Sequence, residues 1–285
     1  MKKKRTAKAI PIISMVGPVG AWVLLLIFIP MIYIIIMSFL TRGTYGGIVF
    51  HFSMEGYKTL FDIKYMEVIM KSVMISLRTT VMCILIGYPF AFYIAKQPAK
   101  RAAMLVLLLM VPFWTSGLVK TYSWVLLLNA TGIVNKILMA IGIISSPVQF
   151  LYNDYAVTLG LVYGFLPYAV LPMYSSIEKM DKSLLEASND LGAKPVTTFF
   201  KVTLPLTASG IFASVILVFI PSLGAYFTAD ALGGGTSLLI GSLIRNLFSV
   251  SKNWPFGAAV SVILVIFTLI LLFLYSRVGD MDDLV

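Results

Sequence analysis

The chain has 285 residues, of which 59% are apolar and only 12% are charged, and its formal net charge is +10. Soluble domains carry roughly 25% charged residues, so this composition excludes a soluble enzyme or binding domain and indicates a polytopic membrane protein. One cysteine, Cys83, excludes an intramolecular disulfide, and one histidine, His51, leaves no His/Cys cluster for a metal site.

Six apolar stretches are long enough to cross a bilayer, whose hydrocarbon core needs roughly 20 residues of helix. In chain order they are Val19 to Phe39, Ile69 to Ala95, Met104 to Leu128, Ala156 to Tyr174, Ile211 to Phe227 and Ala258 to Tyr275. We expect an all-α fold with six transmembrane helices in a membrane domain over residues 19–275. A basic N-terminus, 1–18, and a tail, 276–285, flank this domain.

The connections between these stretches differ in character. The first external loop, residues 40–68, contains several glycines and is compatible with a short surface helix. After the third span, an apolar pattern from Ile133 to Ile144 predicts a short helix along the membrane surface. The triplet Gly233-Gly234-Gly235 lacks the following Gly-Lys-Ser/Thr of a phosphate-binding loop, and the chain has none elsewhere. This polypeptide therefore cannot itself be an ATPase.

The distribution of Lys and Arg predicts the orientation. In a six-span chain both termini and the loops 96–103 and 175–210 share one side, which holds 13 basic residues against six in the other three loops. Basic residues concentrate on the cytoplasmic side, so both termini are expected in the cytoplasm, and the basic pI requires no nucleic-acid partner. The remaining three basic residues, Lys71, Arg78 and Lys120, fall within predicted spans.

The internal loop, residues 175–210, has the pattern of an amphipathic helix. Its apolar positions recur at spacings of three and four and predict one helix face, made of Ile177, Met180, Leu184, Ala187 and Leu191. The polar side is mainly acidic, whereas a helix on anionic lipid is rich in Lys and Arg. We therefore expect this face to be covered by a protein partner rather than by headgroups.

Capping signals divide the same loop into two short helices. Ser183 with Glu186 fits a capping box, Asp181 is a competing cap, and Gly192 supplies a left-handed stop. A second helix is expected to begin at Pro195 and to end at Pro205. Its apolar patch is formed by Val196, Phe199 and Phe200.

The loop also carries a motif. Glu186-Ala187-Ser188 is followed by Gly192 and closes on Val202-Thr203-Leu204-Pro205. This pattern resembles the Glu-Ala-Ala, Gly, Ile-x-Leu-Pro loop in the membrane subunits of ATP-binding-cassette (ABC) importers, from which Ser188 and Val202 depart conservatively.

In that family the loop forms coupling helices that dock into a groove on a separate ATPase. The resemblance implies that Glu186 pairs with a basic residue of the ATPase and that Ala187 and Leu191 fill the groove. It also implies that Gly192 permits the turn between the helices, while Leu204 and Pro205 complete the motif.

Further phrases resemble the PotB-like permeases of spermidine/putrescine importers over almost the whole chain. They are Gly87-Tyr88-Pro89-Phe90-Ala91, Val111-Pro112-Phe113-Trp114-Thr115, Tyr174-Ser175-Ser176-Ile177-Glu178-Lys179, Leu232-Gly233-Gly234 and Trp254-Pro255-Phe256-Gly257-Ala258-Ala259. The resemblance implies a permease in the bacterial inner membrane, with a second, PotC-like permease, a homodimeric ATPase and an extracytoplasmic polyamine-binding protein as partners. ATP and Mg would bind the ATPase, and this chain would hold no cofactor.

A path for a polyamine needs carboxylates, carbonyls and aromatic faces, each aromatic contact adding about 0.5 to 2 kcal/mol. Asp230, near the outer end of the fifth span and with Tyr226 and Phe227 beside it, is the best candidate, and Trp114 and Tyr122 could add aromatic walls. For each of them the alternative interpretation is an interfacial anchor or an ordinary loop charge.

Three other functions remain open. A secondary transporter usually places a carboxylate inside the membrane, yet no acidic residue lies centrally in a predicted span and no duplicated half is apparent. A channel or receptor would use the long internal loop as a regulatory surface. An importer of the same fold could carry an anion or iron instead of a polyamine.

Overall fold

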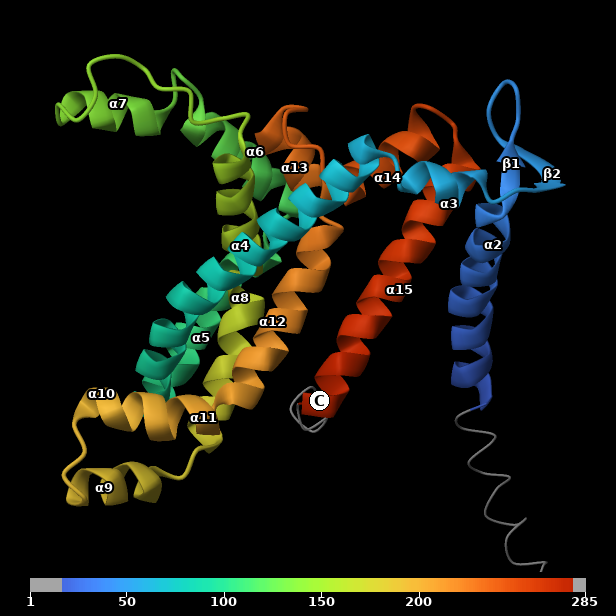
Figure 1. Cartoon of the computed structure of the whole chain (residues 1–285). Coiled ribbons are helices and arrows are strands. Elements are labelled where there is room, and N and C mark those ends of the chain that lie inside the picture. The colour runs from blue at the N-terminus through green and yellow to red at the C-terminus, as the bar shows by residue number, and fades with distance from the viewer. Residues whose placement is uncertain (1–16, 279–285) are drawn as a thin grey trace, which may run out of the picture. The chain divides into compact units, whose positions relative to one another are not determined.

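The computed structural model describes residues 17–278, so most of the predicted basic N-terminus and tail lies outside the described residues. The described chain is predominantly helical, which confirms the all-α prediction (Figure 1). It divides into two compact units, one of residues up to 62 with 244–266, and one of residues 63–243 with those from 267 onward.

The first unit combines the N-terminal span with external elements. Its elements are a π-helix Leu24–Phe28, α2 (Ile29–Ser38), β1 (Leu40–Arg42), β2 (Ile48–Phe52), α3 (Glu55–Leu60), most of α14 (Ile240–Ser249) and the first half of α15 (Trp254–Val278). The short surface helix expected in the first external loop is α3.

The hairpin of β1 and β2 was not predicted, because strands this short give no clear alternation of polar and apolar residues. Gly46 and Gly47 turn the chain with φ values of +95° and +80°, which glycine adopts without steric cost. The turn is fastened to the loop before α15, where Gly47 N donates to Lys252 O (3.1 Å) and Arg42 donates to Ser251 O (2.8 Å).

The second unit contains the main helix bundle and the internal loop. Its elements are α4 (Ile63–Ala95), α5 (Ala99–Trp114), α6 (Gly117–Leu128), α7 (Ile133–Ala140), α8 (Asp154–Lys179), α9 (Lys182–Asp190), α10 (Pro195–Thr198), a π-helix Phe199–Thr203, α11 (Leu204–Leu206), α12 (Ala208–Leu223) and α13 (Tyr226–Gly233). The helix predicted from Ile133 to Ile144 is present as α7 and ends earlier, at Ala140.

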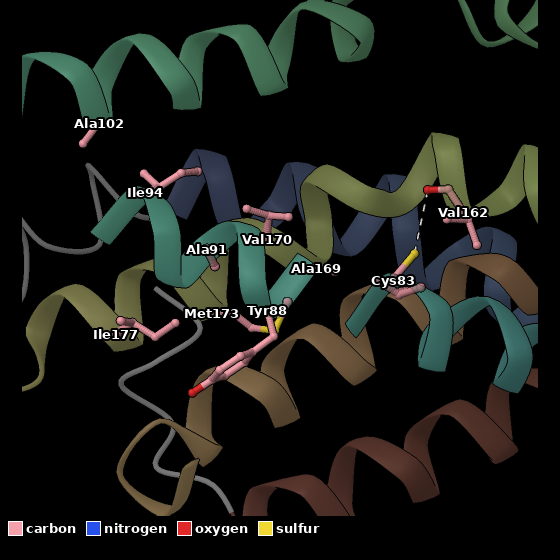
Figure 2. Packing of buried hydrophobic residues seen from close by; sticks show 11 residues of the cluster. Cys83, Tyr88, Ala91, Ile94, Ala102, Val162, Ala169, Val170, Met173 and Ile177 are labelled. Carbon is pink, nitrogen blue, oxygen red and sulfur yellow. Dashed lines mark hydrogen bonds between the residues drawn. The ribbon is translucent and has the colours of Figure 1, made fainter. Parts of the chain in front are cut away.

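The core of this unit is formed by α4, α8 and α12. Figure 2 shows Cys83 and Tyr88 of α4 with Val170 and Met173 of α8 in one buried cluster. Cys83 is fully buried there, as expected for a packing residue. Gly87 packs closely on α8, where a Cβ in its place would lie 2.9 Å from Met173 Cε and 3.2 Å from Val170 Cγ2.

Within residues 17–278, five helical stretches are long and apolar enough to cross a membrane, or six if the bent pair Pro195–Leu206 and Ala208–Leu223 is one span. Two predicted spans have the wrong limits. The third is broken into α5 and α6 at Thr115 and Ser116, both extended, because Pro112 removes a helical hydrogen bond and Gly117 is a poor helix former. The fifth ends at Leu223, before Gly224.

The internal loop contains the two short helices that the sequence predicts. Gly192 lies between them with φ +75°, the left-handed conformation expected. Asp181, not Ser183, caps α9, since its carboxylate accepts from Ser183 N at 2.9 Å. This backbone N–H lowers the pKa of the Asp181 carboxyl, because it stabilises the ionised form.

The prediction that the five apolar residues from Ile177 to Leu191 lie on one face of a single helix is wrong. Ile177 is buried at the end of α8, and Met180 is the residue that ends this helix with extended backbone. The chain breaks between Met180 and α9, so only Leu184, Ala187 and Leu191 belong to the loop's own helices or their ends.

A buried hydrogen bond holds the two short helices together. The Ser188 hydroxyl on α9 and the Thr198 hydroxyl on α10 lie 2.9 Å apart, and both residues are less than a tenth exposed. Ser188 is thus where this sequence departs from the Glu-Ala-Ala pattern, and Thr198 provides its partner.

We expect Ser188→Ala to destabilise the pairing of α9 with α10, because Thr198 keeps a buried hydroxyl without this partner, at a cost of about 1 kcal/mol. Hydrogen exchange of the α9 amides should become faster. In Ser188→Ala/Thr198→Val both polar groups are gone, so exchange should return close to that of the unmodified chain. Equal exchange in all three proteins would contradict a stabilising bond.

Candidate functional site

The internal loop presents its motif residues to the outside of the chain. Glu186 and Ala187 are exposed on α9, and Leu191, just after it, is 88% exposed. Val196 and Phe200 add exposed apolar surface from the second helix. An apolar helix pair with an exposed carboxylate is suited to docking on another protein, as the sequence predicts.

Two predicted members of this surface turn inward instead. Phe199 and Leu204 pack against the buried cluster of α4 and α8. Phe199 meets Tyr88 edge to face, with ring centroids 5.7 Å apart. The patch expected from Val196, Phe199 and Phe200 is therefore reduced to Val196 and Phe200.

The end of the segment is a bend rather than a helix stop. Pro205, expected to end the second helix, lies within α11, and the helix continues to Leu206. The stretch Pro195–Leu206 then meets α12 at an angle of 64°. Proline is tolerated in the first turn of a helix, where its missing N–H is not needed.

A cleft of about 420 Å³ lies in the second unit, between α6, α8 and the break that follows α12. Aromatic side chains dominate its lining, and they are Phe113, Trp124, Tyr163, Phe165, Tyr168, Tyr226 and Phe227. Such a pocket suits the aliphatic stems and ammonium groups of a cationic ligand.

The cleft brings together two of the five residues predicted for the substrate path. Tyr226 and Phe227 line it from the start of α13. Tyr122 contacts Phe227 edge to face at 6.0 Å but is outside the lining. Trp114, 72% exposed, and Asp230 are also outside it.

Lys120 is the one charged side chain among the described residues that line the cleft. The other two basic residues of the predicted spans have partners: Lys71 lies 3.0 Å from Asp154, and Arg78 stacks over Tyr155. The sequence shows Lys120 as a basic residue in a predicted span but gives it no role. An ionisable residue within a membrane helix is nevertheless itself a signal of function.

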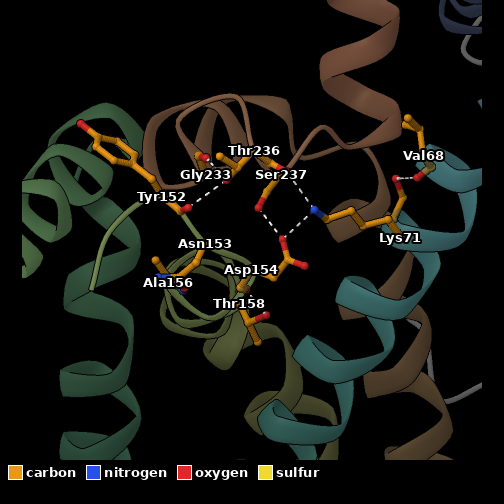
Figure 3. A network of polar contacts seen from close by, with 11 residues as sticks. Val68, Lys71, Tyr152, Asn153, Asp154, Ala156, Thr158, Gly233, Thr236 and Ser237 are labelled. Carbon is orange, nitrogen blue, oxygen red and sulfur yellow. Dashed lines mark hydrogen bonds and ion pairs between the residues drawn. The ribbon is translucent and has the colours of Figure 1, made fainter. Parts of the chain in front are cut away.

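Figure 3 shows how Lys71 and Asp154 belong to a network at the ends of α4, α8 and α13. Lys71 Nζ also donates to Thr236 O at 2.9 Å, and Ser237 donates to the Asp154 carboxylate. The network links these helix ends, and within it Lys71 and Asp154 neutralise each other. It is structural, and it leaves Lys120 as the charge that faces the cleft.

Comparison with known proteins agrees with this architecture. Residues 6–280 match the family model "Binding-protein-dependent transport system inner membrane component". The chain is 41% identical over 266 residues to the spermidine/putrescine transport system permease protein PotB of Haemophilus influenzae, covering 93% of each chain. It is also 41% identical over 263 residues to PotB of Escherichia coli K12, covering 92% of this chain and 96% of that one.

A solved structure shares the fold. In a bacterial alginate ABC transporter, crystallised with a periplasmic protein bound to an alginate pentasaccharide, one chain matches with a TM-score of 0.79 at 17% identity. The match covers 96% of this chain and 95% of that one. Because the family model covers nearly the whole length, the chain belongs to the family of inner-membrane components of binding-protein-dependent transport systems.

Proposed function

We propose that this chain is a permease subunit of an ATP-driven importer for polyamines. The observation that carries the proposal is the sequence similarity to permeases named for spermidine and putrescine. This chain is 41% identical to them, and the match covers more than nine-tenths of its length. The aromatic lining of the cleft supports it, because ring faces attract ammonium groups and pack against their methylene stems.

Energy for transport would come from a separate ATPase docked on the exposed helix pair. Glu186 would pair with a cation of the ATPase, and Ala187 and Leu191 would enter its groove. The same assembly would include a second, PotC-like permease and an external polyamine-binding protein. Both termini of this chain would face the cytoplasm, on the side of α9 and α10.

One observation favours a different substrate. Lys120 is a cation at the cleft, and none of the described lining residues is acidic, so an anion would meet less repulsion there than a polyamine. The alginate transporter, which shares this fold, imports an acidic polysaccharide. An anion importer is therefore the second candidate.

Uptake by the complete transporter decides between these substrates. We expect cells that lack their own polyamine systems to accumulate labelled putrescine and spermidine, and not a labelled oxyanion, when they express this chain with its partner subunits. Lys120→Met should preserve polyamine uptake, because it removes a repulsive charge and keeps the length of the side chain. Oxyanion uptake that is lost in Lys120→Met would establish the second candidate instead.

Docking of the ATPase is tested on α9. Glu186→Ala should abolish transport while the protein stays in the membrane, since an unpaired cation in a partly desolvated contact costs about 2 to 5 kcal/mol. Gly192→Asp should act likewise, because φ +75° strains any residue with a Cβ. Asp190→Ala, also on α9, is the matched control. Normal copurification of the ATPase with both Glu186→Ala and Gly192→Asp would contradict the docking assignment.

Labelling from outside the cell tests the orientation. Cysteines at Tyr45 and Leu191, which are 99% and 88% exposed, are accessible within the chain. A thiol reagent that cannot cross the membrane should label the cysteine at position 45 and not the one at 191 until the membrane is opened. Native Cys83 is buried and adds little background. The reverse pattern would place α9 outside and remove the ATPase docking.

A further inference from the structure

The phrase Gly87-Tyr88-Pro89 that helped to place the family has a structural consequence in this chain. Tyr88 lies in α4 and is only 7% exposed. Its ring meets Phe199, at the start of the π-helix, and its hydroxyl lies 2.7 Å from the hydroxyl of Thr207. One side chain of a long helix therefore contacts both ends of the segment between α10 and the bend.

The direction of this hydrogen bond follows from proton counting. Thr207 has one hydroxyl proton, and it donates to Thr203 O at 2.8 Å. Since a threonine hydroxyl donates one bond and can accept others, Tyr88 is the donor and Thr207 Oγ1 the acceptor. Thr207 is fully buried, so water does not compete for the bond.

Thr207 is also the joint of the segment. Its φ and ψ, −105° and 9°, leave the helical region between α11 and α12, and the two helical stretches meet there at 64°. The π-helix Phe199–Thr203, which only the three residues of α11 separate from Thr207, is a rare form that is frequent at functional sites. The angle between the stretch Pro195–Leu206 and α12 can therefore change at small cost unless a side-chain contact fixes it.

We propose that Tyr88 is a positioning residue for coupling: its bond to Thr207 and its contact with Phe199 set the angle at which α9 and α10 are held below α12. Movement of a docked ATPase then reaches α4 through a hydrogen-bonded joint rather than through a loose hinge. The proposal rests on the proposed function, because it assigns Tyr88 a part in linking ATP hydrolysis to transport.

Removal of the hydroxyl alone tests the bond. In the complete transporter, reconstituted in lipid vesicles with its ATPase, second permease and binding protein, Tyr88→Phe should lower the polyamine imported per ATP by about 2- to 10-fold, the range for one buried hydrogen bond. Assembly and basal ATP hydrolysis should not change. Tyr93→Phe, the same substitution at an exposed position of the same helix, is the control, and equal import per ATP in both variants would overturn the proposal.

Thr207 gives an independent comparison. Thr207→Ser retains the acceptor and should behave as the unmodified chain, whereas Thr207→Val should lower import per ATP at least as much as Tyr88→Phe. The double variant Tyr88→Phe/Thr207→Val should be no worse than Thr207→Val, because both changes remove the same bond. Independent losses that multiply in the double variant would overturn the pairing.

A distance measurement separates this proposal from the identity of the substrate. Spin labels at Leu85 of α4 and Thr197 of α10, which are both exposed and are not among the residues assigned to the docking surface, report the position of the coupling helices relative to α4 without any transport. In the assembled complex without nucleotide, Tyr88→Phe should broaden the distribution of distances between the labels, and Tyr93→Phe should not. Unchanged width in Tyr88→Phe would refute the positioning role, even if polyamine uptake proved the proposed function correct.

Discussion

Close approach of helix backbones is the constraint on which the second unit depends, because lipid tails are as apolar as leucine and give helices no hydrophobic reason to associate. The helices must gain contact and hydrogen bonds instead. A Cβ on Gly210 of α12 would lie 2.6 Å from Ser176 Cβ of α8, so only glycine permits this crossing. Beside it, Ser214 donates to Ala169 O at 2.7 Å across the same pair of helices. The cleft and the internal loop are both attached to helices held in this way.

Much of the fold can be predicted from hydropathy, and the wrong limits of the two predicted spans have one cause. Mean hydropathy is evaluated over about 19 residues, so a change of direction over two residues is averaged away. The stretch from Met104 to Leu128 is apolar on average, yet Thr115 and Ser116 divide it. Gly224 divides Ile211 to Phe227 in the same way. Residues at both breaks, such as Thr115 and Gly224, line the cleft. Because hydropathy does not predict the breaks, the lining of the cleft could be predicted only in part.

The internal loop was predicted more fully because its signals are local. A glycine stop and a proline start act within a few residues, and both occur where the sequence places them. What escaped prediction was pairing between distant hydroxyl groups. Tyr88 and Thr207 are 119 residues apart in the chain, and serine or threonine is common enough in membrane helices that neither residue suggests the other. Ser188 was visible only as a departure from a motif, without the partner that explains it.

The hairpin that begins the first external loop is fastened to residues near the other end of the chain. Arg42 and Ser251 are 209 residues apart, and Gly56 of α3 packs against Ala259 of α15. A ribosome that synthesises the chain from its N-terminus therefore completes residues 63–243 of the second unit before the first unit can close. Until α15 emerges, the first span and its loop have no native contacts from the C-terminal part. Biogenesis of this subunit thus includes an interval in which its earliest segment depends on the insertion machinery or the lipid alone.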